Sequence, residues 1–197
     1  KEVITIMKLK INLPQDELAH DNQAIEWWYF NGFLKSKKKR YAYMNCLFRA
    51  EKEKANLGFL KIPMKYLYFS HSVLYDLTTK EVKKEILPVV IVSEDSFTKE
   101  NLFINYFYPI RKTFINYEIA RFGKKLHIKN QHADLWATEE KKPLFEGGTG
   151  LIDLKDKKTY YYTYPRRKVQ GIIGNESVKG ISWHDHQWSS KGFMKDA

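Results

Sequence analysis

Short segments in which apolar and polar residues alternate recur along the whole of this 197-residue chain. Side chains of a β-strand point alternately to its two faces, so a period of two marks strands with one buried face. The segments are rich in aromatic and β-branched residues, and short polar or glycine-containing breaks separate them. They are Trp27–Leu34, Arg40–Phe48, Tyr66–Asp76, Glu85–Ser93, Leu102–Tyr108, Phe114–Arg121, Lys125–Asn130, Leu144–Leu154, Thr159–Tyr164, Val169–Ile173 and Val178–Trp188.

About ten or eleven short strands at this spacing are typical of an antiparallel barrel or sandwich. The lysine-rich residues 35–39 and the segment Thr78–Lys80 are placed to form the tips of two hairpins. Residues 50–57 are expected to form at most one helical turn. No repeat, low-complexity linker or composition shift divides the chain, so we predict a single all-β domain over residues 1–197.

Composition excludes several classes of protein. Hydrophobic residues make up 43% of the chain, which suffices for a sizeable core. There is no apolar run of about 18 residues that could span a membrane as a helix. Residues 1–14 lack the long apolar segment of a signal peptide, and a mature secreted chain would look the same. The single Cys46 cannot form an internal disulfide and is predicted to be a buried thiol.

The formal net charge of +11 raises the question of nucleic-acid binding. The lysines gather where turns are expected, at residues 35–39, 52–54, 124–125, 141–142 and 155–158. Nucleic-acid-binding proteins concentrate positive charge on one face among stacking aromatics. The observed distribution fits solvated hairpin tips and protected sheet edges. We therefore predict no nucleic-acid partner.

The segment from Trp183 to Trp188 carries two indoles, two imidazoles, an amide and a carboxylate in six consecutive residues. Aromatic surface beside titratable groups suits a site that holds an apolar molecule and moves a proton on it. On a strand, Trp183, Asp185 and Gln187 share one face, and the two histidines and Trp188 share the other.

A second cluster lies near the start, where His20 precedes the run Glu26–Phe30. Its Trp28 shares a strand face with Glu26. The presence of such similar clusters about 150 residues apart predicts that the two segments meet in space and line or close one barrel.

Each candidate also has a structural interpretation. Asp185 can accept hydrogen bonds from indole groups or from Arg166 or Arg167 and hold the barrel shut. Glu26 can pair with a buried donor, and His71 can be a satisfied residue on an aromatic strand. The pair His184 and His186 has the spacing of a zinc site on a strand, but the sequence offers no assured third ligand, so no metal is expected.

Several motifs, taken in order, resemble those of one known family, which includes the carotenoid 1,2-hydratases and the AttH proteins. The opening motif comprises His20, Glu26–Phe30 and Gly32, and the second landmark is Phe69–Asp76. The closing block comprises Glu146–Gly150, Tyr161–Pro165, Gly171 and Val178–Trp188. Fungal cyclases of Diels–Alderase type are similar in fold and share comparable signatures of aromatic and acidic residues.

The resemblance implies a lipocalin-like, calycin-type antiparallel barrel. It also implies a tandem of two such barrels, of which this chain would be the first, ending near the entry to the second. In the hydratases a catalytic aspartate follows an aromatic residue at a spacing that Trp183 and Asp185 match. Their upstream pair of a histidine and an aromatic residue corresponds to Tyr160–Tyr164, which contains no histidine.

Two classes of function follow. One is a lipocalin-like carrier or envelope-associated domain that binds a lipophilic small molecule, beside a transporter or export system in an extracytoplasmic compartment. The other is a hydratase-like or cyclase-like enzyme that protonates an apolar polyene. Asp185 and Glu26 are the candidate catalytic acids, and no cofactor is expected. The candidate ligand-binding residues are Trp28, His71, Tyr162, Trp183 and Gln187.

Overall fold

The computed structural model describes residues 10–54, 65–90, 92–97, 101–108, 113–155 and 157–192. These residues form strands and two single-turn 3₁₀ helices, in this order: η1 (Gln15–Glu17), β1 (Ile25–Lys35), β2 (Arg40–Glu51), β3 (Tyr66–Asp76), β4 (Val82–Val90), β5 (Val92–Phe97), β6 (Asn101–Tyr108), β7 (Thr113–Phe122), β8 (Lys125–Lys129), β9 (Asp134–Glu139), β10 (Leu144–Phe145), η2 (Glu146–Gly148), β11 (Leu151–Asp153), β12 (Lys158–Ile173) and β13 (Glu176–Ser189). Among them no helix is long and apolar enough to cross a membrane.

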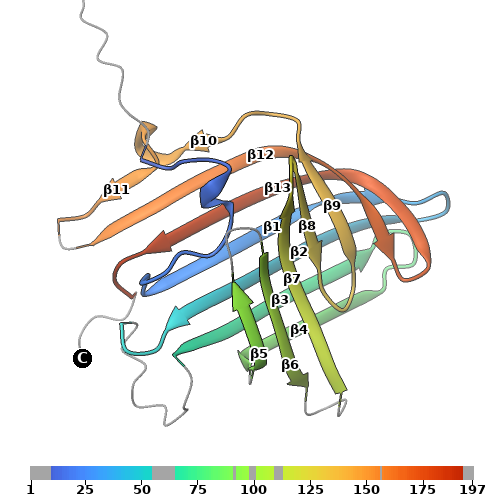
Figure 1. Ribbon diagram of the computed structural model, residues 1–197. Coiled ribbons are helices and arrows are strands. Elements are labelled where there is room, and N and C mark those ends of the chain that lie inside the picture. The colour runs from blue at the N-terminus through green and yellow to red at the C-terminus, as the bar shows by residue number, and fades with distance from the viewer. Residues whose placement is uncertain are drawn as a thin grey trace, which may run out of the picture.

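All thirteen strands belong to one antiparallel sheet, as the alternating pattern predicts. The order along the sheet is β4-β3-β2-β1-β13-β12-β9-β8-β7-β6-β5, with β10 and β11 paired to β12. In Figure 1 the sheet curls, so that β5 to β9 run steeply across the direction of β1 to β4. β4 and β5 are the first and last strands of this order. The end of β4, at Val90, lies close to the start of β5, at Val92, because the Cα atoms of residues two apart are at most about 7 Å from each other.

The two predicted hairpins are confirmed. β1 pairs with β2, and the Oγ of Ser36 accepts the backbone N–H groups of Lys38 and Lys39 at the tip. β3 pairs with β4, and a carboxylate oxygen of Asp76 accepts the N–H groups of Thr78 and Thr79. Short polar side chains that bond to their own backbone stabilise such turns.

The structure corrects several predicted elements. The predicted strand Glu85–Ser93 spans the end of β4, at Val90, and the first residues of β5, which starts at Val92. Asp134–Glu139 forms β9, which no prediction included, because its buried residues, Leu135 and Ala137, give only a weak apolar signal. Residues 144–154 form two short strands around η2 instead of one strand. The predicted strands 159–164 and 169–173 are one strand, β12, with an irregularity between Tyr164 and Arg167. The predicted helical turn is wrong where residues are described: β2 continues to Glu51, and a non-helical turn follows.

The inner face of the sheet carries the core. Its largest fully buried side chains include Trp28, Phe30 and Leu47, and side chains from β7, β8 and β9 pack in the same cluster. The segment that carries η1 packs on this core, and there Leu18 is 2% exposed. It is fixed by the indole Nε1 of Trp28, which donates to the carbonyl oxygen of Glu17 at 3.1 Å. Between β2, β3, β8 and β9 the interior leaves a cavity of about 10 Å³, too small for an organic ligand.

β1 and β13 approach closely at two glycines. A Cβ on Gly32 would lie 2.0 Å from the carbonyl oxygen of Ile181, and a Cβ on Gly180 would lie 1.9 Å from that of Phe33. No other residue fits at these positions without a shift of backbone. The absence of a Cβ therefore permits the tight coiling of the two strands that carry both sequence motifs.

Candidate functional site

The predicted meeting of the two motifs is confirmed. β1 and β13 are neighbours, and their register opposes Trp28 to His186 and Tyr29 to Asp185. The predicted separation of faces on β13 also holds. His184 and His186 are fully buried, whereas Trp183 is 39% exposed. The site therefore consists of two parts, a buried cluster inside the barrel and an aromatic surface outside it.

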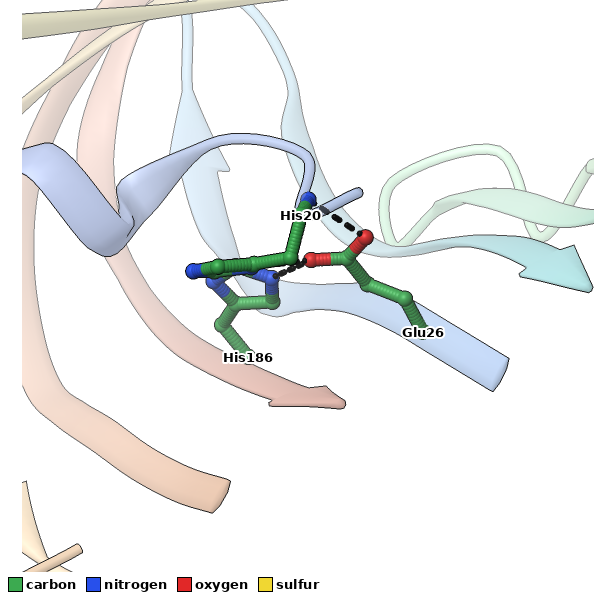
Figure 2. Close-up of side chains that lie close together, drawn as sticks. All are labelled: His20, Glu26 and His186. Carbon is green, nitrogen blue, oxygen red and sulfur yellow. Dashed lines mark hydrogen bonds and ion pairs between the residues drawn. The ribbon is translucent and has the colours of Figure 1, made fainter. Parts of the chain in front are cut away.

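The buried cluster centres on the carboxylate of Glu26. Oε1 lies 2.7 Å from Nδ1 of His20 and 2.9 Å from Nε2 of His186. Figure 2 shows the two imidazoles converging on this carboxylate from different segments. Oε2 lies 3.0 Å from Nη2 of Arg49 and accepts the backbone N–H of His20 at 3.0 Å. Hydrogen bonds and charges on both oxygens are what a buried carboxylate requires.

The pKa values follow from these contacts. Burial alone would raise the pKa of Glu26, but hydrogen bonds from His186 and His20 and the charge of Arg49 lower it to about 2. Burial would lower the pKa of His20, but hydrogen bonds to Asp16 and Glu26 raise it to about 9. Burial dominates at His186 and lowers its pKa. At neutral pH the cluster therefore contains ionised Glu26 beside an imidazolium at His20.

Aromatic rings hold both imidazoles in place. The ring of His20 stacks on Trp188 with centroids 3.9 Å apart, and Trp28 stacks on His186 at 4.9 Å. The hydroxyl of Tyr162 lies 3.2 Å from Nδ1 of His186. These contacts fix the orientation of both rings. The ring nitrogens of His20 and His186 also have polar partners.

His20, Glu26 and His186 are also residue types that bind zinc, and their ligand atoms lie within 4.8 Å of one another. Each of these atoms already has a partner, because both ring nitrogens contact the same Oε1. The guanidinium of Arg49 also neutralises the carboxylate from its other side. The arrangement is complete as an ion-pair network of protein groups.

A second ion pair lies farther along the inner face. Nη2 of Arg167 donates to the carboxylate of Glu17, and its guanidinium lies 3.7 Å from the ring centroid of Tyr164. His184 stacks between Phe30 and Tyr164, and neither of its ring nitrogens has a partner among the described residues. Burial keeps its pKa well below the usual value. The inner groups thus tie η1 to the sheet.

The outer surface of the sheet is unusually aromatic. Half-buried or exposed aromatic side chains point outward from β1, β2, β3, β12 and β13, and we call them the outer aromatic face. They are Trp27, Tyr29, Phe33, Phe48, Phe69, Tyr75, Tyr161 and Trp183. Contiguous exposed apolar surface of this kind marks an interaction site or a ligand-binding site.

Polar groups cross this face in one row. The register aligns His71, Cys46, Tyr29, Asp185 and Thr163 on five adjacent strands. Adjacent strands lie about 4.8 Å apart, so His71 and Asp185 are separated by about 14 Å. Two residues predicted from distant motifs therefore share a row, with a tyrosine and a thiol between them.

Asp185 is half-buried in this row. The Oγ1 of Thr163 donates to its Oδ1 at 2.5 Å. Burial raises the pKa of Tyr161, and the nearby charge of Asp185 adds to this shift. The predicted arginine partners are not observed, because Arg166 pairs with Glu140 and Arg167 pairs with Glu17.

The structure thus divides the predicted site residues into two groups. Glu26, Trp28 and Tyr162 lie inside, and His71, Trp183, Asp185 and Gln187 lie on the outer face.

Sequence reasoning missed Arg49 and Glu17, and it named Arg167 only as a possible partner of Asp185. Arg49 could have been found, since it is a lone charge at a buried position of the alternating segment that becomes β2.

The curled antiparallel sheet with an aromatic interior defines a lipocalin-like fold. A family model described as AttH-like matches residues 6–197, so the chain belongs to the AttH-like family. This result confirms the resemblance inferred from the motifs. No curated protein matches the chain.

One solved structure, of a protein assigned to AttH, supports the same fold. A protein of Nitrosomonas europaea assigned to AttH is 20% identical and superposes with a TM-score of 0.67, over 95% of this chain and 58% of that protein. Kievitone hydratase from Nectria haematococca is 11% identical with a TM-score of 0.45, over 88% of this chain and 52% of that protein. The chain thus spans a little over half the length of both structures.

Proposed function

We propose that this chain binds a lipophilic small molecule on its outer aromatic face, as a carrier or binding domain. The observation that carries the proposal is Trp183, which is 39% exposed on the same strand face as the half-buried Asp185. The inner face is the alternative location, but its polar groups near η1 are paired and its aromatic rings are stacked on one another. An exposed aromatic surface with few polar groups has the composition of a ligand site.

A sheet face needs a cover before it can enclose an apolar molecule. We infer that a second lipocalin-like domain of the same polypeptide supplies this cover. The support is the relative from Nitrosomonas europaea, of which this chain covers 58%. The ligand would then lie in the seam between the two domains, with Trp183 and Tyr29 forming one wall.

Acid catalysis on a polyene is a second candidate, which the surroundings of Asp185 favour. Its carboxyl group lies beside the hydroxyl group of Thr163, and Tyr29 is its register neighbour on β1. Protonation of an alkene by Asp185 would leave a carbocation, which the aromatic faces stabilise. Water would then add to the cation and return a proton to the carboxylate. Glu26 fits this role less well, because its carboxylate is ionised and held by three partners.

The test is a titration of the full-length protein with retinoid, carotenoid and fatty-acyl probes, monitored by tryptophan fluorescence. We expect saturable quenching that is strongly reduced in Trp183→Phe. The matched control Trp136→Phe, on β9 away from the row of Asp185, should quench like the parent protein. Absence of quenching by every probe would overturn the proposed function.

Asp185→Asn separates the two candidate functions. Binding should remain within about threefold of the parent protein, because burial of apolar area supplies most of the affinity. If the protein is an enzyme that takes its proton from Asp185, turnover of a polyene substrate should be abolished while binding persists. Unchanged turnover would remove Asp185 as the acid.

A further inference from the structure

A cationic pocket lies at one end of the outer aromatic face. Its floor is apolar, with Phe33 62% exposed and Ile181 37% exposed. The pocket has a volume of about 590 Å³, within the range of small-molecule sites. Five basic side chains line it, namely Lys35, Arg40, Arg166, Lys168 and Lys179.

The positive charge of this pocket is largely uncompensated. Glu140 is its one acidic lining residue, so five cations and one carboxylate give a formal charge of +4. That carboxylate accepts a hydrogen bond of 2.7 Å from Nε of Arg166. The other four cations form no ion pair with any residue that the structure describes. An isolated surface lysine is only a solvated charge, but four around one exposed phenylalanine attract an anion that also has an apolar part.

The cationic pocket is continuous with the site proposed above. Ile181, Trp183 and Asp185 occupy successive positions on the outer face of β13 and lie opposite Phe33, Asn31 and Tyr29 of β1. At about 3.3 Å per residue, Ile181 and Asp185 are about 13 Å apart. An acidic head group at the cations would therefore lay its chain along Trp183 toward Asp185.

We propose that the ligand is an amphiphilic acid, a free long-chain or polyene carboxylate whose head group binds in the cationic pocket. This inference rests on the proposed function and adds the chemical class of the ligand. The carboxylate contacts Lys168 and Lys179, and the chain covers Phe33, Ile181 and Trp183. A neutral carotenoid would leave the four unpaired cations without a counter-charge, so the charge pattern favours the acid.

The test compares retinoic acid with retinol, which share a polyene and differ at the head group. Both quench tryptophan fluorescence, and N-acetyltryptophanamide corrects for light absorption by the probe. In the full-length protein at pH 7.5, the acid should bind about tenfold more tightly than the alcohol at low salt. This preference should shrink as salt is added.

The variant Lys168→Gln/Lys179→Gln should lose about fivefold in affinity for the acid and retain its affinity for the alcohol. The control Lys155→Gln/Lys158→Gln removes the same charge near the other end of β12, which begins at Lys158, and should leave both affinities unchanged. Equal affinities for acid and alcohol in the parent protein would overturn this inference and leave the proposed function standing. Quenching by neither retinoid would also overturn this inference, and it would overturn the proposed function as well if the carotenoid and fatty-acyl probes fail to quench.

Vesicles with and without an anionic phospholipid identify the alternative source of negative charge. Binding to the anionic vesicles that falls in Lys168→Gln/Lys179→Gln, without preference for the free acid, would show that the pocket binds a membrane surface and would overturn the proposal. Preference for the free acid with no selective binding to the anionic vesicles would support it.

Discussion

Asp185 and His186 are adjacent in the chain and lie on opposite faces of β13, where His186 contacts the buried Glu26 and Asp185 accepts a bond from Thr163. One strand thus contributes to two environments of different chemistry. Inside, the polar groups are paired and fixed by stacked rings. Outside, a carboxyl group lies among exposed aromatics. This division separates the residues that hold the barrel end together from those that can meet a ligand.

Replacement of Glu26 by Gln should strongly destabilise the fold. It removes the negative charge that compensates Arg49 and His20, and a buried ion pair that loses one partner costs about 3 kcal/mol or more. Urea unfolding measures the loss. Glu53→Gln is the control, because the side chain of Glu53 is 74% exposed. A loss below about 0.5 kcal/mol for Glu26→Gln would contradict the network described here.

The stability of the protein should fall as the pH rises above neutrality, because of His20. Its pKa is raised from 6.5 to about 9 in the folded state. A group with a raised pKa stabilises the fold fully below the unfolded value of 6.5, and this contribution is lost as the pH rises through 9. The free energy of unfolding should drop by about 1 to 3 kcal/mol between pH 6.5 and 9.5. In His20→Gln this part of the pH dependence should be absent, and an unchanged profile would refute the assignment.

Much of this arrangement could be predicted from the sequence. Period-two alternation locates most strands, and the two aromatic motifs indicate that β1 and β13 meet. The inward direction of His184, His186 and Trp188 could not be predicted, since either face of such a strand can be buried. Arg49 was missed although it lies opposite Glu26 in the β1–β2 hairpin, because the predicted second strand ended one residue before it. The pairing of Arg167 with Glu17 could not be predicted, since 150 residues separate them and only the folded sheet brings them together.

His184 and His186 offer a matched pair, because they lie on the same strand face and are both fully buried. His186→Leu should cost about 2 to 4 kcal/mol, because it leaves Glu26 with one hydrogen bond fewer inside the core. His184→Leu should be neutral or stabilising by about 1 kcal/mol, since its ring nitrogens have no partner among the described residues. Thermal and urea unfolding compare the two. Equal losses would show that His184 has a polar role as well.

Gly180→Ala should destabilise the seam between β1 and β13. The added Cβ would meet the carbonyl oxygen of Phe33 at 1.9 Å, so the strands would have to separate. We expect a loss of about 2 kcal/mol or more, of the size of other steric mismatches in a packed core. The adjacent Lys179→Ala is the control, because that side chain is exposed. Similar stability of the two variants would show that the backbone relaxes at this position without cost.

The 197-residue chain on its own should expose its outer aromatic face to solvent and associate through it. Exposed aromatic surface of this extent binds hydrophobic dyes and promotes self-association. We expect the isolated chain to bind an anilinonaphthalene dye and to show concentration-dependent sedimentation. Phe33→Ser/Trp183→Ser should weaken both effects, because these side chains are 62% and 39% exposed and their loss removes apolar area without opening the core. Phe122→Ser, which changes an exposed phenylalanine on β7, is the matched control and should leave both effects intact. A compact monomer without dye binding would show that the outer aromatic face needs no covering domain, which would remove the main support for a ligand site in the seam.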